Sequence, residues 1–292
     1  MVSFFHQLVR RLRRGAGQDS GTPSRAERHR VTPSLERLGD RIVPALAIVP
    51  NGTGLDVVGD GADDVATLST SASGDILLNG VGTGYNVSSI TSLRVYGNGG
   101  TDVLDLSLLP DLGVPVLIDG GLNSDALLGS QGADVTRGGA GEDWLFAGDG
   151  NDDLLGGLNA DHRYGEEGND ILRDDNARDY FNGGDGFDAL LGEVGDGIDT
   201  VDGGGEDIVI GGRTAWDINH DGLREMRSMW RDTSVVYADR IDDLRTASYL
   251  DASHVFSDAD ADTVEGGAGN DWIRAEAADT LPDYVLFVEQ LN

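Results

Sequence analysis

The sequence lacks cysteine and lysine and is poor in aromatic residues, and these shortages exclude several classes of protein. Because none of its 292 residues is cysteine, the chain has no disulfide framework, no thiolate metal site and no cysteine nucleophile. No apolar run approaches the ~20 residues that cross a bilayer, so we expect no transmembrane segment. With 39% hydrophobic and only 6% aromatic residues, the chain has little material for a thick hydrophobic core. We therefore expect another force to hold the fold together.

The charge is strongly negative and unevenly distributed. The chain has 21 basic residues, all arginine, against 52 acidic residues, which gives a formal net charge of −31. Such a balance argues against nucleic-acid binding, because phosphates require a basic surface. Residues 1–41 nevertheless hold nine arginines and only four acidic residues. This asymmetry predicts that residues 1–45 form a basic, largely disordered arm ahead of an acidic body.

One piece of this arm resembles a known sorting segment. Residues 35–45 read Leu-Glu-Arg-Leu-Gly-Asp-Arg-Ile-Val-Pro-Ala. They are similar to the Leu-Glu-x-Leu-x-Asp-Arg-x-Val-Pro-Ala segment at the start of many large exported bacterial proteins, with Gly39 where glutamate is usual. The resemblance implies export or surface sorting.

A nine-residue repeat dominates the middle of the chain. Residues two and five positions before each repeated aspartate are mostly glycine, and the residue two positions after is mostly apolar. The consensus is Gly-Gly-x-Gly-x-Asp-x-apolar-x, an established signature of calcium-binding β-helix repeats. Eight aspartates follow one another at this spacing: Asp125, Asp134, Asp143, Asp152, Asp161, Asp170, Asp179 and Asp188.

The spacing predicts stacked coils of 18 residues. Glycine tolerates a positive φ, so the Gly-Gly-x-Gly segment can turn tightly, and the x-apolar-x segment can form a short strand with one side chain pointing inward. Two turns and two strands make one coil, and the next coil stacks on it at about 4.8 Å. Aspartates 18 residues apart then lie above one another in two columns, one starting at Asp125 and the other at Asp134.

Such columns require a cation. Two unit charges about 5 Å apart at an effective dielectric constant of ~20 repel by about 3 kcal/mol. Calcium takes six to eight oxygen ligands, which carboxylates from two coils and turn carbonyls can supply. We therefore predict several calcium ions, held by the eight repeated aspartates, by Asp199, Asp207 and Asp271 in outlying motifs, and by Gly139, Gly141, Gly148, Gly150, Gly168, Gly184 and Gly186 in the turns.

Residues 120–191 resemble the RTX (repeats-in-toxin) family. The resemblance implies a calcium-filled parallel β-roll, usually in secreted bacterial proteins, with the ions held between successive coils. Three departures stand out: Asp174-Asp175 replaces a glycine pair, Asn123 and Asn159 replace turn glycines, and Arg163 replaces an inward aliphatic residue. Asparagine tolerates left-handed geometry, whereas Arg163 is expected to weaken its strand. We expect fewer ions than motifs.

The fold class is therefore predicted as all-β, a parallel β-roll or β-solenoid of nonapeptide repeats with a small helical insert near the C-terminus. An irregular, strand-rich lead-in is expected over residues 46–118, the roll over 119–212, a helical insert or cap over 213–264, and a final repeat with a tail over 265–292. Asp64 and Asp102, in the lead-in, are expected to be solvated turn residues, with stray metal ligation as the alternative. Residues 283–292 fit either a C-terminal export signal or a final strand.

The sequence favours a binding or structural role over catalysis. It contains neither a His-Glu-x-x-His zinc motif nor a Gly-x-Ser-x-Gly nucleophile elbow. His162 lies inside a repeat, where we expect an exposed strand residue. We predict a calcium-binding protein, secreted or at the cell surface, that folds in extracellular calcium and contacts cell-surface or matrix components. Two alternatives remain: an accessory or degenerate part of a secreted hydrolase or polysaccharide-modifying enzyme, and a permanently disordered acidic protein.

Overall fold

The computed structural model describes residues 46–173 and 179–191 throughout and later residues only as short strands. All regular structure in these residues is β-strand, and no helix occurs among them. The expected basic arm at 1–45 lies outside the described residues. So does the expected helical insert at 213–264, apart from the short strands β19 (Arg213–Thr214) and β20 (Val255–Phe256), which pair antiparallel.

The other described strands form two sheets. The first sheet has 11 strands, in the order β1 (Ala47–Asn51), β2 (Gly54–Val58), β6 (Leu93–Gly99), β8 (Val116–Leu122), β10 (Asp134–Ala140), β12 (Asp153–Leu158), β14 (Ile171–Arg173), β16 (Ala189–Leu191), β18 (Ile208–Ile210), β21 (Trp272–Glu276) and β22 (Phe287–Leu291). The second sheet has nine strands, in the order β17 (Asp199–Gly203), β15 (Tyr180–Gly186), β13 (His162–Gly168), β11 (Trp144–Gly150), β9 (Ala126–Leu128), β7 (Val103–Leu108), β3 (Val65–Thr70), β4 (Asp75–Leu78) and β5 (Val81–Asn86).

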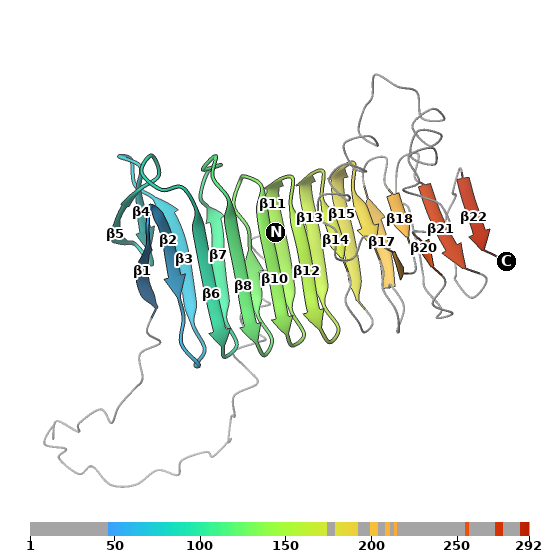
Figure 1. Ribbon diagram of the computed structural model, residues 1–292, viewed down its shortest axis with the longest axis horizontal. Coiled ribbons are helices and arrows are strands. Elements are labelled where there is room, and N and C mark those ends of the chain that lie inside the picture. Colours follow the sequence, from blue (N-terminus) through green and yellow to red (C-terminus); the bar gives the residue numbers. More distant parts are fainter. Residues whose placement is uncertain are drawn as a thin grey trace, which may run out of the picture. The chain divides into compact units, whose positions relative to one another are not determined.

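From β6 to β18 the chain alternates between the two sheets, so that each strand lies beside the strand two places later in the sequence (Figure 1). These pairs are parallel. In the repeats, paired residues are 18 positions apart, as in Thr136 with Leu154 and Leu145 with Arg163. The predicted 18-residue coil is therefore present from β8 to β16.

The sheets are mixed, because their first strands pair antiparallel. β1 forms an antiparallel pair with β2, and β3, β4 and β5 form an antiparallel meander. β2 and β3 in turn pair parallel with β6 and β7. Residues 46–118 thus contribute to the same two sheets as the repeats, and their antiparallel strands were not predicted from the sequence.

The end of the chain also contributes a strand. β22 pairs parallel with β21 in register from Trp272 with Phe287 to Glu276 with Leu291. A final strand is therefore present at Phe287–Leu291, and the C-terminal export signal stays a prediction.

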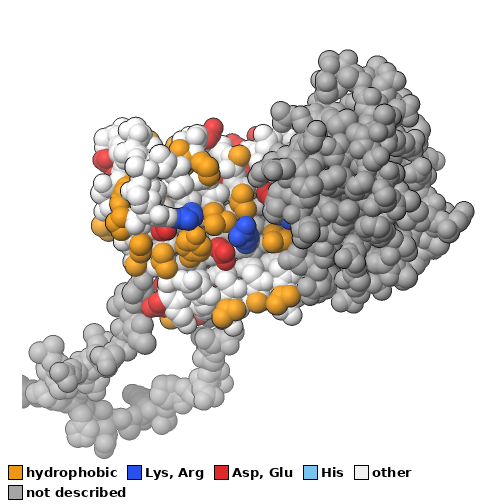
Figure 2. All heavy atoms as spheres, in the orientation of Figure 1, with side chains coloured by type: hydrophobic (Ala, Val, Ile, Leu, Met, Phe, Trp, Pro, Cys, Tyr) orange, Lys and Arg blue, Asp and Glu red, His pale blue; other side chains and the backbone are white. Residues whose placement is uncertain are grey.

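A narrow hydrophobic core lies between the two sheets. Alternate residues of each strand point inward, and the inward residues of neighbouring strands lie above one another because the strands are in register. In the second sheet this produces a row of fully buried side chains at Leu104, Leu127, Leu145, Arg163 and Phe181. On the outer face shown in Figure 2, hydrophobic side chains are interspersed with single arginine and acidic side chains.

Candidate metal centre

The repeated aspartates form two hydrogen-bonded columns. In the first column the backbone N–H of Asp125 donates to Oδ1 of Asp143 at 2.7 Å, and the N–H of Asp143 donates to Oδ1 of Asp161 at 2.7 Å. The next step, from the N–H of Asp161 to Oδ1 of Asp179, measures 2.6 Å. Each carboxylate thus receives a hydrogen bond from the backbone of the preceding coil, which fixes the direction of its second oxygen.

The first column begins earlier than the sequence analysis predicted. The N–H of Asp64 donates to Oδ1 of Asp102 at 2.7 Å, and the N–H of Asp102 donates to Oδ1 of Asp125 at 2.7 Å. Both side chains are fully buried, so the expectation that they are solvated was wrong. The interpretation failed because inserted segments stretch the spacing to 38 and 23 residues instead of 18.

A usable signal for these two positions was present in the sequence. A glycine precedes each aspartate of this part of the column by five residues, as Gly59 precedes Asp64 and Gly97 precedes Asp102. A Cβ on either glycine would collide with an oxygen of that aspartate and with a backbone carbonyl of the following coil. A search for this glycine–aspartate pair without a fixed period would have found both.

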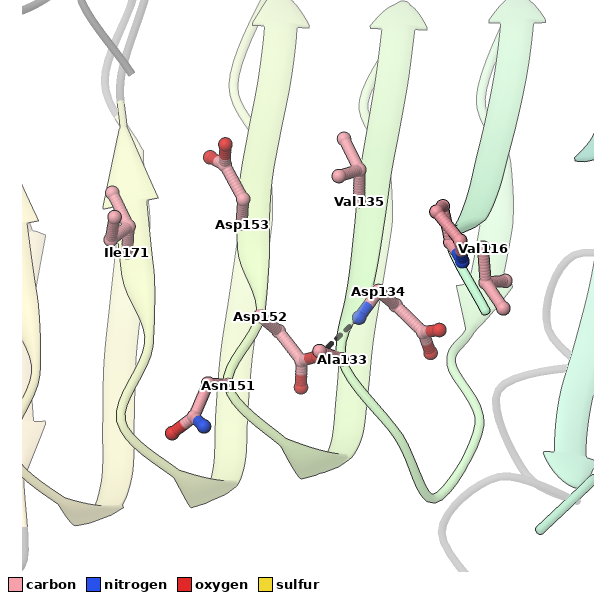
Figure 3. A pocket seen from close by; sticks show the side chains of 9 residues that line it. Val116, Ala133, Asp134, Val135, Asn151, Asp152, Asp153 and Ile171 are labelled. Atoms are coloured by element: carbon pink, nitrogen blue, oxygen red, sulfur yellow. Dashed lines mark hydrogen bonds between the residues drawn. The ribbon is translucent and has the colours of Figure 1, made fainter. Parts of the chain in front are cut away.

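The second column contains Asp134, Asp152, Asp170 and Asp188. Its backbone N–H groups donate to Oδ1 of the next aspartate at 2.7–2.8 Å, and the first of these bonds is drawn in Figure 3. Asp134, at the start of the column, differs from the others because Ser130 donates to both of its carboxylate oxygens. Asp134 and Asp152 line a pocket that also includes Asn151 and Asp153 (Figure 3).

The second oxygen of several first-column carboxylates is buried among other oxygen atoms. Asp102 Oδ2, Asp125 Oδ2 and Asp143 Oδ2 are inaccessible to solvent and accept no hydrogen bond from the described part of the chain. A Cβ on Gly138 would collide with Asp143 Oδ2 and with the carbonyl oxygen of Gly156. Carboxylate and carbonyl oxygens therefore face the same small space beside the turn, and only glycine leaves this space open.

The turn glycines adopt the conformation that the repeat requires. Gly139, Gly148 and Gly184 have φ between +98° and +111°, and Gly141, Gly150, Gly168 and Gly186 have φ between +143° and +154°. Asn123 and Asn159, which replace glycines, have φ of +70° and +80°. The expectation that asparagine is tolerated there is confirmed.

Burial makes the charged form of these aspartates unfavourable. It raises the pKa of Asp125 to about 8, with the charges of Asp143 and Asp102 adding to the effect, and it raises the pKa of Asp161 to about 8. Burial likewise raises the pKa of Asp102 and of Asp143 to about 6. Without a cation, an ionised column therefore opposes the fold that creates it.

The donor set fits calcium. The atoms around the turn spaces are carboxylate and carbonyl oxygens, which are the ligands that calcium prefers. Among the described residues, no three Asp, Glu or His side chains converge on one point. A metal ion here would therefore need backbone carbonyls as well as carboxylates, which is the ligand set that the repeat pattern predicts.

Three of the predicted ligands are not placed with their side chains. Asp199 begins β17, whose backbone alone is described. Asp207 and Asp271 lie outside the described residues, as does the Asp174-Asp175 pair that replaces a glycine pair.

Arg163 occupies an inward position, as its place in the repeat predicts, and its side chain is fully buried. Its strand is regular, because β13 pairs in register with β11 and β15 on either side. The guanidinium approaches the first column, with Nη2 at 2.9 Å from Asp179 Oδ2 and at 3.5 Å from Asp161 Oδ2.

His162 points outward from the second sheet and is half-buried against an aromatic neighbour. Its ring stacks on Trp144 with centroids 4.0 Å apart. Burial lowers the pKa of His162, which favours the neutral ring, and the residue lies on the opposite face of the sheet from the aspartate columns.

Comparison with known protein families identifies the repeats. The family model of the RTX calcium-binding nonapeptide repeat matches in four copies, over residues 128–162, 164–190 and 256–279. The chain carries RTX repeats. RTX nonapeptide repeats bind calcium ions, so the comparison agrees with the ligand set described above.

The matched RTX repeats contain the whole second column and part of the first. They include the aspartates from Asp134 to Asp188 and, separately, Asp271, whereas Asp64, Asp102 and Asp125 precede them. The only family found is a calcium-binding repeat, and no catalytic family matched. No curated protein and no solved structure matched the chain. Among the described residues, no helix has the length and apolar character needed to cross a membrane.

Proposed function

We propose that this chain is an exported structural or surface-interaction protein whose RTX repeats fold into a calcium-filled parallel β-roll in extracellular calcium. The observation that carries the proposal is the first column, in which buried carboxylate oxygens that accept no hydrogen bond from the described residues face backbone carbonyls across the turn. Asp125 and Asp143 are the clearest examples, because each has one oxygen held by a backbone N–H and one left facing the turn.

The residues that would hold calcium are the column aspartates together with the turn carbonyls. In the first column these are Asp64, Asp102, Asp125, Asp143, Asp161 and Asp179; in the second they are Asp134, Asp152, Asp170 and Asp188. Carbonyl oxygens would come from glycines at the ends of β10, β11, β13 and β15 and just after β10, namely Gly139, Gly141, Gly148, Gly150, Gly168, Gly184 and Gly186. Asp199, Asp207 and Asp271 stay predicted ligands on the basis of their motifs.

Calcium would couple folding to location. The folded chain binds the ion and the unfolded chain does not, so calcium shifts the equilibrium toward the folded state by mass action. Extracellular calcium modules have dissociation constants of about 10⁻⁴ to 10⁻³ M. Sites in this range would be empty in the cytosol and filled outside the cell, so the chain would stay expanded before export and fold afterwards.

Export and an extracellular or cell-surface location are supported by two sequence features, the RTX repeats and the segment at residues 35–45 that resembles a bacterial sorting segment. The strongly acidic body also supports an extracellular location, because only outside the cell would calcium be concentrated enough to neutralise much of its negative charge. Cell-surface or matrix components are the partners that this location would provide.

A calcium titration followed by circular dichroism tests the proposal. We expect strand signal to appear cooperatively as calcium rises through the sub-millimolar to millimolar range, and magnesium to be a poor substitute because it gives up its water reluctantly. The key comparison is Asp143→Asn against Asp149→Asn. Each variant removes one negative charge, but Asp143 is buried in the column and Asp149 is exposed near the end of β11.

We expect Asp143→Asn to raise the calcium midpoint by about 10- to 100-fold, because a charge-assisted interaction contributes about 1.5–3 kcal/mol. Asp149→Asn should titrate like the unchanged chain. A chain that gains no strand signal in calcium, or a pair of variants that titrate alike, would refute the proposal.

A further inference from the structure

Arg163 lies where the repeat calls for an apolar residue. It is paired in register with Leu145 on one side and Phe181 on the other, and all three side chains are fully buried between the sheets. Its guanidinium lies over the ring of Phe181, with the central carbon 4.7 Å from the ring centroid. An ionised side chain in such a place requires a compensating charge.

That charge comes from the first column. Arg163 Nη2 contacts Asp179 Oδ2 at 2.9 Å and Asp161 Oδ2 at 3.5 Å. These are the second oxygens of the two carboxylates, because Oδ1 of each accepts the backbone hydrogen bond of the column. A single cationic nitrogen thus lies between two successive aspartates.

An earlier step of the same column shows what Arg163 changes. Between Asp125 and Asp143 the equivalent second oxygens accept no hydrogen bond within the described part of the chain. A Cβ on Gly138 would meet an aspartate oxygen and a carbonyl oxygen, whereas a Cβ on Gly156, one coil later, would meet Asp161 Oδ2 and the guanidinium of Arg163. The space that faces oxygens in one coil is taken by the guanidinium in the next.

We infer that the guanidinium of Arg163 takes the place of one calcium ion, so that the step between Asp161 and Asp179 is held by a side chain and binds no metal. This inference rests on the proposed function, since it assumes that the other steps of the column bind calcium. It gives the protein one link between coils that does not depend on calcium. The coils of β13 and β15 would therefore be the part of the repeats most resistant to calcium removal.

Replacing Arg163 by leucine, the residue found at the corresponding inward positions Leu127 and Leu145, should create a calcium site. We expect Arg163→Leu, and equally the longer Arg163→Met, to bind one more calcium ion per chain than the unchanged protein. Arg163→Lys, which keeps a positive charge, should bind the original number. The measurement is equilibrium dialysis of the full chain at up to ~10 mM calcium, above the dissociation constants of extracellular sites, with calcium counted by atomic emission.

Arg173→Leu is the matched control. Arg173 is also a buried arginine paired with an aspartate, at 2.8 Å from Asp153, but its partner is not a column residue. Its replacement should leave the number of bound ions unchanged.

The possible results distinguish a failure of the Arg163 inference from a failure of the proposed function. If the unchanged chain binds several ions and neither Arg163→Leu nor Arg163→Met binds one more, the inference is wrong and the proposed function stands. If both variants fail to gain strand signal in saturating calcium, the inference is also wrong, because it requires calcium to take over the role of the guanidinium. If the unchanged chain binds no calcium, both the inference and the proposed function are wrong.

Discussion

The backbone N–H of Asp102 donates to Oδ1 of Asp125 at 2.7 Å, across 23 residues of sequence. Both residues precede the matched RTX repeats, and the next bond of the column, from the N–H of Asp125 to Asp143, enters them. The second oxygen of Asp102 is buried and accepts no hydrogen bond from the described residues, as in Asp125. The candidate metal centre therefore extends beyond the segment that the repeat pattern marks.

Asp102→Asn should therefore weaken calcium binding although Asp102 lies outside the regular repeats. We expect the midpoint of the calcium titration to shift to a calcium concentration about tenfold higher or more, because the variant loses a charged ligand oxygen. Isothermal titration calorimetry on the full chain measures the shift.

The control for this prediction is Asp105→Asn, at a residue in β7 three positions after Asp102. Asp105 bonds to Ser107 on the outer side of the strand, and its replacement should leave the titration unchanged. Equal shifts in both variants would mean that net charge, and not position in the column, determines binding.

Gly138→Ala should obstruct one turn space. A Cβ at this residue would collide with Asp143 Oδ2 and with the Gly156 carbonyl. We expect fewer bound ions and a free energy of unfolding in calcium lower by about 1–3 kcal/mol, the range for overpacking a close contact. Chemical denaturation in the presence of calcium gives the second quantity.

Gly99→Ala provides the comparison for the glycine variant. Gly99 lies in β6, and its nearest Cβ contacts are at 3.8 and 3.9 Å, which is ordinary packing. Alanine there should be neutral or slightly stabilising, since it restricts the unfolded chain. A loss of stability as large as that of Gly138→Ala would show that any side chain in these strands is harmful, and would remove the argument for an open turn space.

The stability of the metal-free chain should depend on pH in the direction opposite to that of most acidic proteins. Burial raises the pKa of Asp125 from 3.8 to about 8 in the folded state, so between about pH 4 and pH 8 the folded chain binds more protons than the unfolded chain. The free energy of unfolding then falls as pH rises through this window and is greatest at its acidic end.

Calcium should reverse this dependence. The ion favours the ionised carboxylates, so protons compete with it, and calcium affinity should fall as pH is lowered from 8 to 5. Strand signal by circular dichroism in metal-free buffer and urea unfolding in calcium, each at pH 5 and pH 8, measure the two dependences. A metal-free chain that is more stable at pH 8 than at pH 5 would contradict the buried position of these aspartates.

The regular part of the fold and site could be predicted from the sequence because the repeat itself sets the geometry. A nine-residue period with one inward residue per strand predicts 18-residue coils that stack with their aspartates aligned. The aspartates from Asp125 to Asp188 are found in the two predicted columns. Sequence reasoning failed at Asp64 and Asp102, where insertions break the period while the column continues. It also failed at the antiparallel strands β1, β4 and β5, because pairing direction depends on which strands meet and not on local pattern.

Arg163 shows a different limit. Its inward position followed from the repeat, but its partners did not, because the contact with Asp179 depends on a long side chain reaching from the core to the column. The sequence indicated a defect in the strand at this point, whereas the structure shows a regular strand with a buried ion pair.

The 18-residue register has a consequence for how a chain of this kind can change in length. Duplicating or deleting 18 residues would add or remove one whole coil. Every remaining aspartate would stay in its original column, with an aspartate above and below it as before. A change of nine residues would instead move all later strands to the opposite sheet and exchange the two columns. The longer intervals before Asp102 and Asp125 show that extra residues are tolerated when they form loops or hairpins outside the coils. Insertions and deletions are therefore expected to be tolerated there and to be disruptive within a coil.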